Sequence, residues 1–250
     1  MGIEKKLGID HIYVVHPPFG YEWHEQRLQK ILGEKLGFDY EFFEQNGIVL
    51  NETEYSRMIA QYFTPDIREI LPTGILDCTL RHILFYERMI ERGDRFALIL
   101  ENDPCPMRNF PDMLAKITTE AENLPAGIFI SLENTTLKFP RRKDVRRGQY
   151  LYKADFGRCA GAYILDFAAA QNIVNHLQKH RCNKVIDHWH NDMAGAGVFS
   201  IYWAHPSCVE QGSHNGRTQR GAISTKRAGI LRRISWLLQK FYKQYLLRII

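Results

Sequence analysis

Hydrophobic residues recur along the chain in two patterns, and together these predict strands that alternate with helices. Residues 96–100 form a short apolar run, and residues 128–132 form another that contains one serine, Ser131; such runs are typical of strands covered on both faces of a sheet. Apolar residues spaced by three and four positions instead indicate helices with one buried face. The predicted strands are residues 11–16, 39–43, 96–100, 128–132, 162–165 and 198–205. The predicted helices are residues 22–37, 51–72, 80–92 and 166–180, the last with Asp166 as its N-cap.

This alternation indicates an α/β fold with a mostly parallel sheet flanked by helices. The 250 residues are enough for one large domain with a sizeable core. Neither an internal repeat nor a low-complexity linker divides the chain. We therefore expect one catalytic-type domain over residues 1–222 and a separate C-terminal segment over residues 223–250.

The composition is that of an ordinary soluble globular protein, with 45% hydrophobic and 24% charged residues. No apolar stretch approaches the roughly 18 residues that would predict a membrane span. The opening MGIEKKLGID has no apolar stretch behind its charges, so we expect no secretory signal. The five cysteines are scattered without a CxxC pair, which favours reduced thiols in the cytoplasm over a disulfide framework or zinc knuckle.

Charge is distributed unevenly along the chain. From Gln211 onward there are nine Lys or Arg residues and no Asp or Glu, which leaves 24 basic against 28 acidic residues in the first 210. The protein is therefore a mildly acidic body with a basic C-terminal segment. Residues 138–147 form a second basic cluster in a predicted loop, which either attracts phosphate groups or is simply solvated.

The C-terminal segment from Lys226 to Ile250 has the pattern of a basic amphipathic helix. Its predicted apolar face consists of Ile230, Leu231, Ile234, Leu237, Leu238, Phe241, Tyr245 and Ile249. Another flank carries Arg232, Arg233, Lys240 and Lys243. This pattern predicts contact with an anionic membrane surface. The alternative is docking on the body or in a homodimer. We do not expect nucleic-acid binding, because the aromatic residues follow helical spacing and the body is acidic.

Two carboxylates follow the predicted strand in ALILENDPCP (97–106). Ligands of open α/β sheets lie beyond the carboxyl ends of the strands, where Glu101 and Asp103 are placed. Residues two apart in an extended chain point the same way, so both side chains can face one ligand. Hard oxygen donors suit Mg²⁺ or Mn²⁺, which often share phosphate oxygens. The alternative is that Glu101 only caps a helix or pairs with an arginine.

The stretch from Gly74 to Pro104 resembles the signature of glycosyltransferase family 25. Gly74, Cys78, His82 and Glu101-Asn102-Asp103 occur in the family's order and at similar spacing. The resemblance continues in AGAYILDFAAAQNIVNHL (160–177), VIDHWHND (185–192) and IYWAHPSCVEQ (201–211).

The chain also departs from the family pattern at three places. Arg81 stands where the family usually has Ser, Asn102 replaces a middle Asp, and His16-Pro17 replaces Asn-Leu. We expect Asn102 to be tolerated, because as the middle residue it points away from the two acids.

The resemblance implies a Rossmann-type, GT-A-like fold and an inverting, metal-assisted transferase. The implied donor is UDP-galactose or UDP-glucose, and the implied acceptor is a lipid-linked or core oligosaccharide of lipopolysaccharide type. The expected location is cytoplasmic and peripheral on the inner membrane. The alternative is a non-catalytic sugar- or membrane-binding relative whose altered acidic motif has lost its metal.

The family motif also suggests roles for individual residues around a Mn²⁺ or Mg²⁺ ion. We expect Asp103 to be the principal ligand, with Glu101 on a metal-bound water or the ribose and Asn102 offering a carbonyl oxygen. His82 either contacts the donor or is structural. His205 and His214 are candidate extra metal ligands, although a single histidine is more often structural.

The acceptor hydroxyl needs a base within hydrogen-bond reach. Asp187 matches the family's acidic position and is the first candidate, with Asp192 behind it; beside them, Trp189 is expected to stack on a sugar. Alternatively, Asp187 caps a helix that begins near His188. A third interpretation places His188 and His190 on a strand that binds a metal in a hydrolase.

Overall fold

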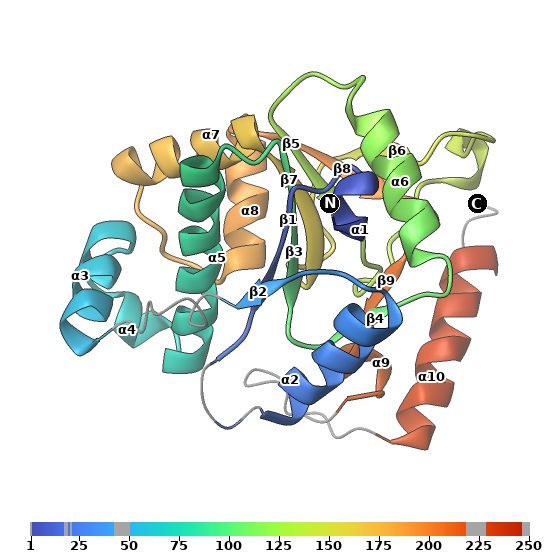
Figure 1. Ribbon diagram of the computed structural model, residues 1–250, viewed down its shortest axis with the longest axis horizontal. Coiled ribbons are helices and arrows are strands. Elements are labelled where there is room, and N and C mark those ends of the chain that lie inside the picture. The colour runs from blue at the N-terminus through green and yellow to red at the C-terminus, as the bar shows by residue number, and fades with distance from the viewer. Residues whose placement is uncertain (1, 18–19, 21, 43–50, 219–228, 247–250) are drawn as a thin grey trace.

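The computed structural model describes residues 2–17, 20, 22–42, 51–218 and 229–246. Its centre is a seven-stranded sheet with the order β2-β1-β3-β7-β5-β8-β6 (Figure 1). The strands are β1 (His11–Val15), β2 (Glu41–Phe42), β3 (Phe96–Glu101), β5 (Ile128–Ser131), β6 (Leu151–Ala154), β7 (Ala162–Asp166) and β8 (Ser200–Ala204). The predicted strand at 39–43 is confirmed for its central residues, and Phe43 lies outside the described residues.

The pairings fix the direction of every strand in this sheet. β1 is parallel to β2 and β3, and β5 is parallel to β8. β7 lies antiparallel between β3 and β5, so β3 and β5 point the same way, and β6 is antiparallel to β8. Five strands therefore share one direction, while β6 and β7 run the opposite way. The predicted α/β fold with a mostly parallel sheet is confirmed at this level.

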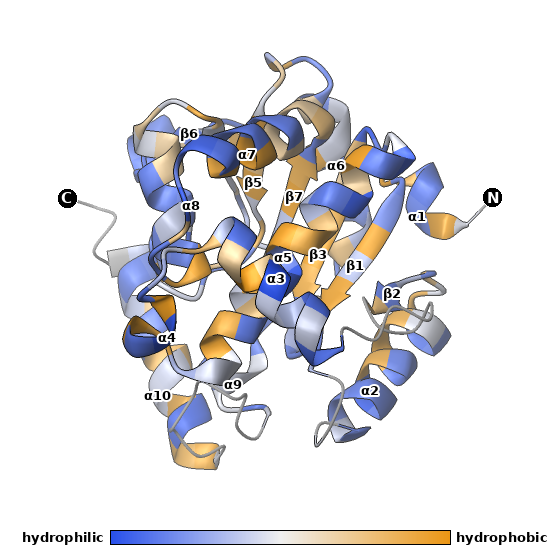
Figure 2. Cartoon of the chain, turned by 90° about the vertical axis from the view of Figure 1, so that its left-hand side faces the viewer, coloured by the Kyte–Doolittle hydropathy of each residue, from blue (hydrophilic) through white to orange (hydrophobic). Residues whose placement is uncertain are grey.

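Helices cover both faces of the sheet (Figure 1). One face carries α3 (Glu52–Tyr62), α4 (Ile67–Ile70), α5 (Thr73–Arg92), α7 (Phe167–Lys179) and α8 (Ile186–Gly195). The other carries α1 (Ile3–Lys6), α2 (Glu22–Leu28), the π-helical Gln29–Lys35 and α6 (Phe110–Ala121). Figure 2 shows the mostly apolar strands β1, β3, β5 and β7 behind α3 and α5.

The alternation of side chains explains why β3 reads as an uninterrupted apolar run. Ala97 and Ile99 enter the core on the α5 side, whereas Leu98 and Leu100 enter the core on the α6 side. Both sets are fully buried, as predicted for a strand covered on both faces. Burial on two sides fixes the register of β3, and with it the position of the residues that follow.

Two helix boundaries show how local signals operate in this chain. α5 begins at Thr73, directly after Pro72, seven residues before the predicted start at Leu80. It ends at Gly93, which adopts a left-handed conformation with φ of 71°. The predicted N-cap of α7 is confirmed, because the Asp166 carboxylate accepts a hydrogen bond of 2.8 Å from the Ala169 amide.

The predicted helix over 51–72 is divided, because α3 ends at Tyr62 and the short α4 begins only at Ile67. Pro65 lies in the interruption, where its missing N–H and rigid ring disfavour a continuous helix. A short 3₁₀ turn, Arg142–Asp144, lies within the basic 138–147 cluster, whose arginines and lysines are exposed.

The C-terminal part folds back beside the end of β3. β4 (Pro104–Pro106) pairs antiparallel with β9 (Val209–Gln211), which leads into α9 (Gly212–Asn215). α10 (Ile230–Phe241), followed by the π-helical Tyr242–Leu246, lies along one side of the molecule (Figure 1). The predicted boundary between residues 222 and 223 lies outside the described residues, as do Lys226 and Ile249. No helix in the described part of the chain is both long and apolar enough to span a bilayer.

Candidate active site

Glu101 and Asp103 both meet the segment that joins β9 to α9. Glu101 is the last residue of β3, and its Oε2 accepts a hydrogen bond of 2.9 Å from the Gln211 side-chain amide. The Asp103 carboxylate accepts a hydrogen bond of 2.8 Å from the Ser213 amide, and its backbone oxygen accepts one of 2.8 Å from the Gly212 amide. The end of β3 and residues 211–213 therefore frame one site.

Asp103 presents an unsatisfied oxygen at this site. The residue is 3% exposed, and its Oδ1 is buried without a hydrogen-bond partner, whereas Oδ2 is held by Ser213. Buried polar atoms are nearly always satisfied, so an orphaned carboxylate oxygen indicates a missing partner such as a cation. The described geometry therefore fits the expected role of Asp103 as the principal metal ligand.

Carboxylates accumulate around Glu101. Burial raises the pKa of Glu101 well above its usual value, and the charges of Asp103, Glu133 and Asp187 raise it further, while the Gln211 hydrogen bond lowers it in part. The Glu101 side chain is still 22% exposed, so the site is open to solvent. A bound cation would relieve the repulsion among these acids.

Gly161 allows Gln211 to reach Glu101. Gly161 lies just before β7, and its carbonyl accepts a hydrogen bond of 2.9 Å from the Glu101 amide. A Cβ atom at this position would lie only 2.2 Å from Gln211 Nε2 and 2.5 Å from Gln211 Cγ. Because the clash extends to the inner part of the side chain, only glycine leaves Gln211 in place.

We expect Gly161→Ala to destabilise the fold by about 1–3 kcal/mol, the usual range for overpacking a filled interior. Denaturant unfolding measures this. Gly195→Ala in α8 is the matched control, because nothing lies within 4 Å of a Cβ added there. Equal stability of the two variants would contradict the close approach of Gly161 to Gln211.

Glu133 is connected to Glu101 by a chain of hydrogen bonds through Thr135 and Gln211. It is fully buried, and its Oε1 accepts hydrogen bonds from the amides of Gly161 (2.7 Å) and Ala162 (3.3 Å). The Thr135 hydroxyl lies between Glu133 Oε2 and Gln211 Oε1, the latter at 3.0 Å. The Thr135 hydroxyl has one proton for these two acceptors, and a neutral Glu133 that donates to Thr135 would leave that proton for Gln211 Oε1.

A protonated Glu133 satisfies both contacts of Thr135, and burial of Glu133 favours that form. Burial raises the pKa of Glu133 to about 8, although the contact with Thr135, the hydrogen bond from the Gly161 amide and the charge of Arg158 act in the opposite direction. In this neutral form Glu133 donates a hydrogen bond to Thr135, Thr135 donates one to Gln211 Oε1, and Gln211 Nε2 donates one to Glu101.

Glu133→Gln is therefore expected to unfold within about 1 kcal/mol of the original chain at neutral pH, because the amide can make the same contacts as the neutral acid. Glu133→Ala should cost about 2–5 kcal/mol, since it leaves buried amides unpaired and a cavity behind. Thermal and urea unfolding distinguish the two. A Gln variant as unstable as the Ala variant would show that Glu133 is needed as an anion.

The structure brings Asp187 to the acid pair and places Asp192 elsewhere. Asp187 is half-buried in the first turn of α8, and its charge contributes to raising the pKa of Glu101. Asp192 is exposed and forms an ion pair with Lys184. The N-cap of α8 is Val185, so Asp187 belongs to the first helical turn and does not cap it. Asp187 Oδ1 accepts a hydrogen bond of 2.8 Å from the His188 amide.

Two interpretations of the DHWH segment are wrong. Residues 186–195 form a helix, so His188 and His190 project in different directions and do not share a metal as neighbours on a strand would. His188 is exposed, whereas the buried His190 meets the Tyr86 hydroxyl at 2.7 Å. Trp189 is 4% exposed and belongs to the core, so it offers no ring face to a sugar.

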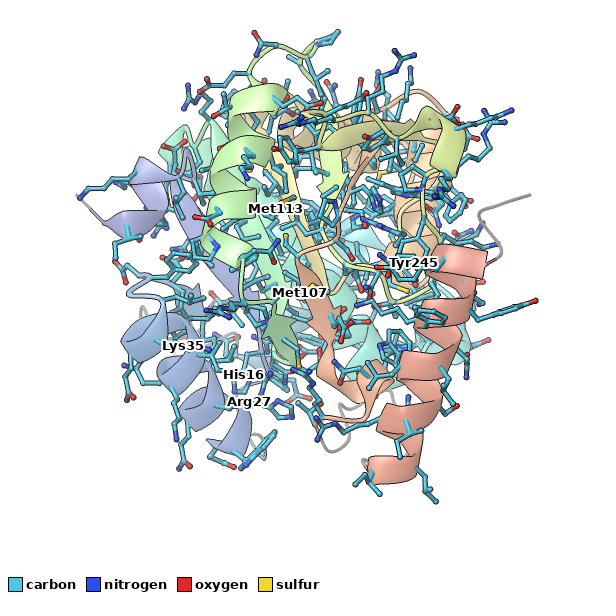
Figure 3. All side chains as sticks on the ribbon, turned by 90° about the vertical axis from the view of Figure 1, so that its right-hand side faces the viewer. His16, Arg27, Lys35, Met107, Met113 and Tyr245 are labelled. Atoms are coloured by element: carbon cyan, nitrogen blue, oxygen red, sulfur yellow. The ribbon has the colours of Figure 1, made fainter. Side chains whose placement is uncertain are left out.

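His82 and Asn102, both predicted to bind the donor, have different surroundings in the structure. His82 is fully buried, and its Nδ1 lies 2.8 Å from the Tyr163 hydroxyl; burial lowers the pKa of His82 to about 3, so the ring is neutral. Asn102 turns instead toward the end of β1, where its amide lies 3.4 Å from Nδ1 of His16, which is labelled in Figure 3. This contact agrees with the expectation that Asn102 points away from Glu101 and Asp103.

The two candidate histidine ligands occupy different surroundings. His205 is buried just after β8, and its ring contacts those of Phe139 and Tyr152. His214 is exposed on α9, next to Ser213, and its carbonyl accepts a hydrogen bond of 3.2 Å from Arg232. Only His214 is adjacent in sequence to a residue that binds Asp103.

Sequence patterns did not place Gln211, Gly161, Glu133 or Cys78 beside Glu101, although Cys78 belongs to the family motif. Gln211, Gly161 and Glu133 are brought to Glu101 by strand pairings between distant segments, which leave no local signal. Cys78 does carry a signal, because it lies four residues before His82 and thus on the same face of α5.

A separate hollow of about 170 Å³ lies at the opposite end of the sheet, around the start of β1. Asp10, His11, Glu41 and Arg92 are among the residues that line it. It contains none of the residues predicted to be catalytic.

Comparison with known proteins shows which family the chain comes from. The model of glycosyltransferase family 25 (LPS biosynthesis protein) matches residues 23–189. The chain belongs to glycosyltransferase family 25. The matched span runs from α2 to α8 and includes Glu101, Asp103 and Asp187, whereas Gln211, Ser213 and α10 lie beyond it.

Two curated relatives carry the same family name. The chain is 22% identical over 176 residues to a glycosyltransferase 25 family member of Aedes aegypti, covering 68% of this chain and 28% of that protein. It is 23% identical over 176 residues to one of Anopheles gambiae, covering 68% and 29% respectively. The chain thus spans less than a third of the length of these curated relatives.

Proposed function

We propose that this family 25 chain is an inverting glycosyltransferase with a GT-A-like fold. It transfers a hexose, galactose or glucose, from a UDP-sugar to a lipopolysaccharide-type oligosaccharide. The observation that carries the proposal is the pair Glu101 and Asp103 at the carboxyl end of β3, with Asp103 Oδ1 buried and unpartnered. This is the end of the sheet where α/β proteins bind their ligands.

The donor set at the acid pair fits Mn²⁺ or Mg²⁺. Asp103 Oδ1 is an available hard oxygen donor, and Glu101 adds a carboxylate that can hold a metal-bound water. When bound, such an ion neutralises the charge that develops on the departing diphosphate. The chain itself fixes both carboxylates through Gln211 and Ser213, so they need little reorganisation during the reaction.

Asp187 is the proposed base for the acceptor hydroxyl. As the hydroxyl oxygen attacks the anomeric carbon, its proton passes to the Asp187 carboxylate and the sugar–phosphate bond breaks on the opposite face. Asp187 is half-buried close to the acid pair, whereas Asp192 is exposed and paired with Lys184. The electrostatic coupling of Asp187 to Glu101 is what favours it.

Asp187→Asn is expected to lower the rate of sugar transfer by about 10²–10⁴-fold, the usual contribution of a general base. Asp192→Asn removes a charge from the same helix and should leave the rate nearly unchanged. UDP release from UDP-galactose and UDP-glucose with an oligosaccharide acceptor measures both. Full activity of Asp187→Asn excludes it as the base, and no UDP release from any nucleotide sugar by the original chain favours the non-catalytic alternative.

We also propose that α10 lies on an anionic membrane surface, where a lipid-linked acceptor would be held. The polar side of α10 binds the body: Lys240 forms a 2.6 Å ion pair with Glu210, and Arg232 binds the His214 carbonyl. The opposite side is apolar and exposed. Together with the π-helical Tyr242–Leu246, α10 exposes the large side chains of Ile230, Leu231, Ile234, Leu237, Leu238, Phe241, Tyr242 and Tyr245.

The charges of this segment favour lipid as the occupant. Residues 211–250 carry nine basic and no acidic side chains, so the helix and its surroundings complement an anionic surface.

The contact between α10 and the body also connects α10 to the candidate active site. Burial alone would raise the pKa of Glu210, but Lys240 and Asn215 lower it overall, so Glu210 is a firmly ionised partner. Its neighbour Gln211 holds Glu101.

A further inference from the structure

We propose that Cys78, His82 and Glu101 form a binding site for a thiophilic divalent cation of the Zn²⁺ class, distinct from the site at Asp103. Their ligand atoms all lie within 4.8 Å of one another. They are the His, Cys, Asp and Glu side chains that meet this condition in the part of the chain that the structure describes. The inference stands apart from the proposed glycosyl transfer, because it concerns metal binding without any nucleotide.

The backbone places the three ligands on rigid elements. Cys78 and His82 are four residues apart on α5, so they lie one above the other on one face of the helix. Glu101 approaches that face from the end of β3. Tetrahedral Zn²⁺ with bonds of about 2.0–2.3 Å brings its ligand atoms to roughly 3.5 Å of one another. Side-chain rotations that move each ligand atom by about 1 Å are enough to bring the three atoms to this separation.

His82 supplies the second observation that points to a ligand. Its Nε2 is buried without a hydrogen-bond partner and lies 4.0 Å from Glu101 Oε1, which is too long for a hydrogen bond. Its Nδ1 lies 2.8 Å from the Tyr163 hydroxyl. Metal-bound histidines characteristically use the second ring nitrogen in this way, which fixes the tautomer and the orientation of the ring.

A chain of hydrogen bonds behind His82 is compatible with the required tautomer. The Tyr163 and Tyr86 hydroxyls are 2.6 Å apart, and the Tyr86 hydroxyl lies 2.7 Å from His190 Nε2. With a proton on His82 Nδ1, each group donates to the next, and His190 Nε2 is the final acceptor. This orientation leaves the lone pair of His82 Nε2 directed at the cluster.

Glu101 divides its two oxygens between neighbouring sites. Oε1 faces His82, whereas Oε2 is held by Gln211. Asp103 Oδ1 lies outside the cluster, so the hard oxygen site and the mixed sulfur, nitrogen and oxygen site are separate. A thiolate ligand selects Zn²⁺ over Mg²⁺ or Mn²⁺. On binding, the Cys78 thiol releases its proton to solvent.

Titration of the full chain with Co²⁺, a spectroscopic substitute for Zn²⁺, tests this site directly. We expect one equivalent to produce thiolate-to-cobalt charge-transfer absorption, which is displaced by Zn²⁺. Cys78→Ser should abolish that absorption, and His82→Gln should weaken binding by more than about 100-fold. Cys159→Ser is the matched control: its half-buried thiol also lies near Asp187 but outside the cluster, and it should bind like the original chain.

A second measurement needs no variant and so does not depend on the variants folding. One equivalent of Zn²⁺ should slow alkylation of Cys78 by more than about tenfold, as judged by peptide mapping, with Cys159 unaffected. Unchanged alkylation of Cys78, absence of the charge-transfer band, or its persistence in Cys78→Ser would each overturn the inference.

Discussion

Asp103→Asn is expected to lower sugar transfer by about 10³-fold or more while leaving the chain folded. Asparagine keeps an oxygen that can accept the Ser213 amide hydrogen bond, so the link between β3 and α9 should survive. What disappears is the negative charge on the buried, unpartnered oxygen. Without that charge the chain loses its strongest hard donor, and the leaving diphosphate loses its neutralisation.

The loss should appear in transfer assays at saturating Mn²⁺, with unfolding curves run beside them. Asp112→Asn on the exposed side of α6 is the control, since it removes one exposed carboxylate that takes no part in the described contacts of Glu101 and Asp103, and it should retain full activity. Activity of Asp103→Asn within a few-fold of the control would remove Asp103 from the proposed role.

The double change Leu237→Glu/Leu238→Glu is expected to weaken binding to anionic vesicles by about 100-fold or more. The two side chains are 58% and 64% exposed on the outward face of α10, where each would bury its apolar surface in lipid. Two leucines contribute roughly 3–6 kcal/mol on full burial, and 1.4 kcal/mol corresponds to a factor of ten. Sedimentation with phosphatidylglycerol-containing vesicles measures the effect.

Ser235→Glu/Gln239→Glu is the matched control, because it adds the same charge at exposed, non-apolar positions of the same helix. It should lose roughly 1 kcal/mol per added charge, or about 30-fold in all, so the leucine variant, which loses the apolar contribution as well, should bind more weakly than this control by about 100-fold or more. An equal loss of vesicle binding in both variants would mean that the added negative charge, and not the loss of apolar surface, causes the effect. If the original chain does not bind vesicles but forms a dimer that Leu237→Glu/Leu238→Glu disrupts, the apolar face of α10 is a dimer interface.

The fold was predictable where local pattern decides it. β3 and β5 follow from apolar runs without alternation, and α7 from the Asp166 cap. The antiparallel course of β7 between β3 and β5 was not predictable, because no local signal specifies a partner. This reversal brings Gly161 to the end of β3, and so shapes the site.

The candidate site was predictable only in its acids. Glu101, Asp103 and Asp187 were expected, while their supports, Gln211 and Glu133, come from segments that pairing alone brings near. For α10 the sequence indicated an apolar face and a basic flank, but not which of them meets the body. The Glu210–Lys240 ion pair settles the orientation of the described helix.

The central claim is that the acids at the end of β3 bind a sugar nucleotide through a divalent cation. Calorimetric titration of the full chain with UDP, in the presence of Mn²⁺ and then of a chelator, tests it most directly. We predict that UDP binds with Mn²⁺, and that binding disappears both with the chelator and in Asp103→Asn. Binding of UDP that is unchanged by the chelator and by Asp103→Asn would contradict the account.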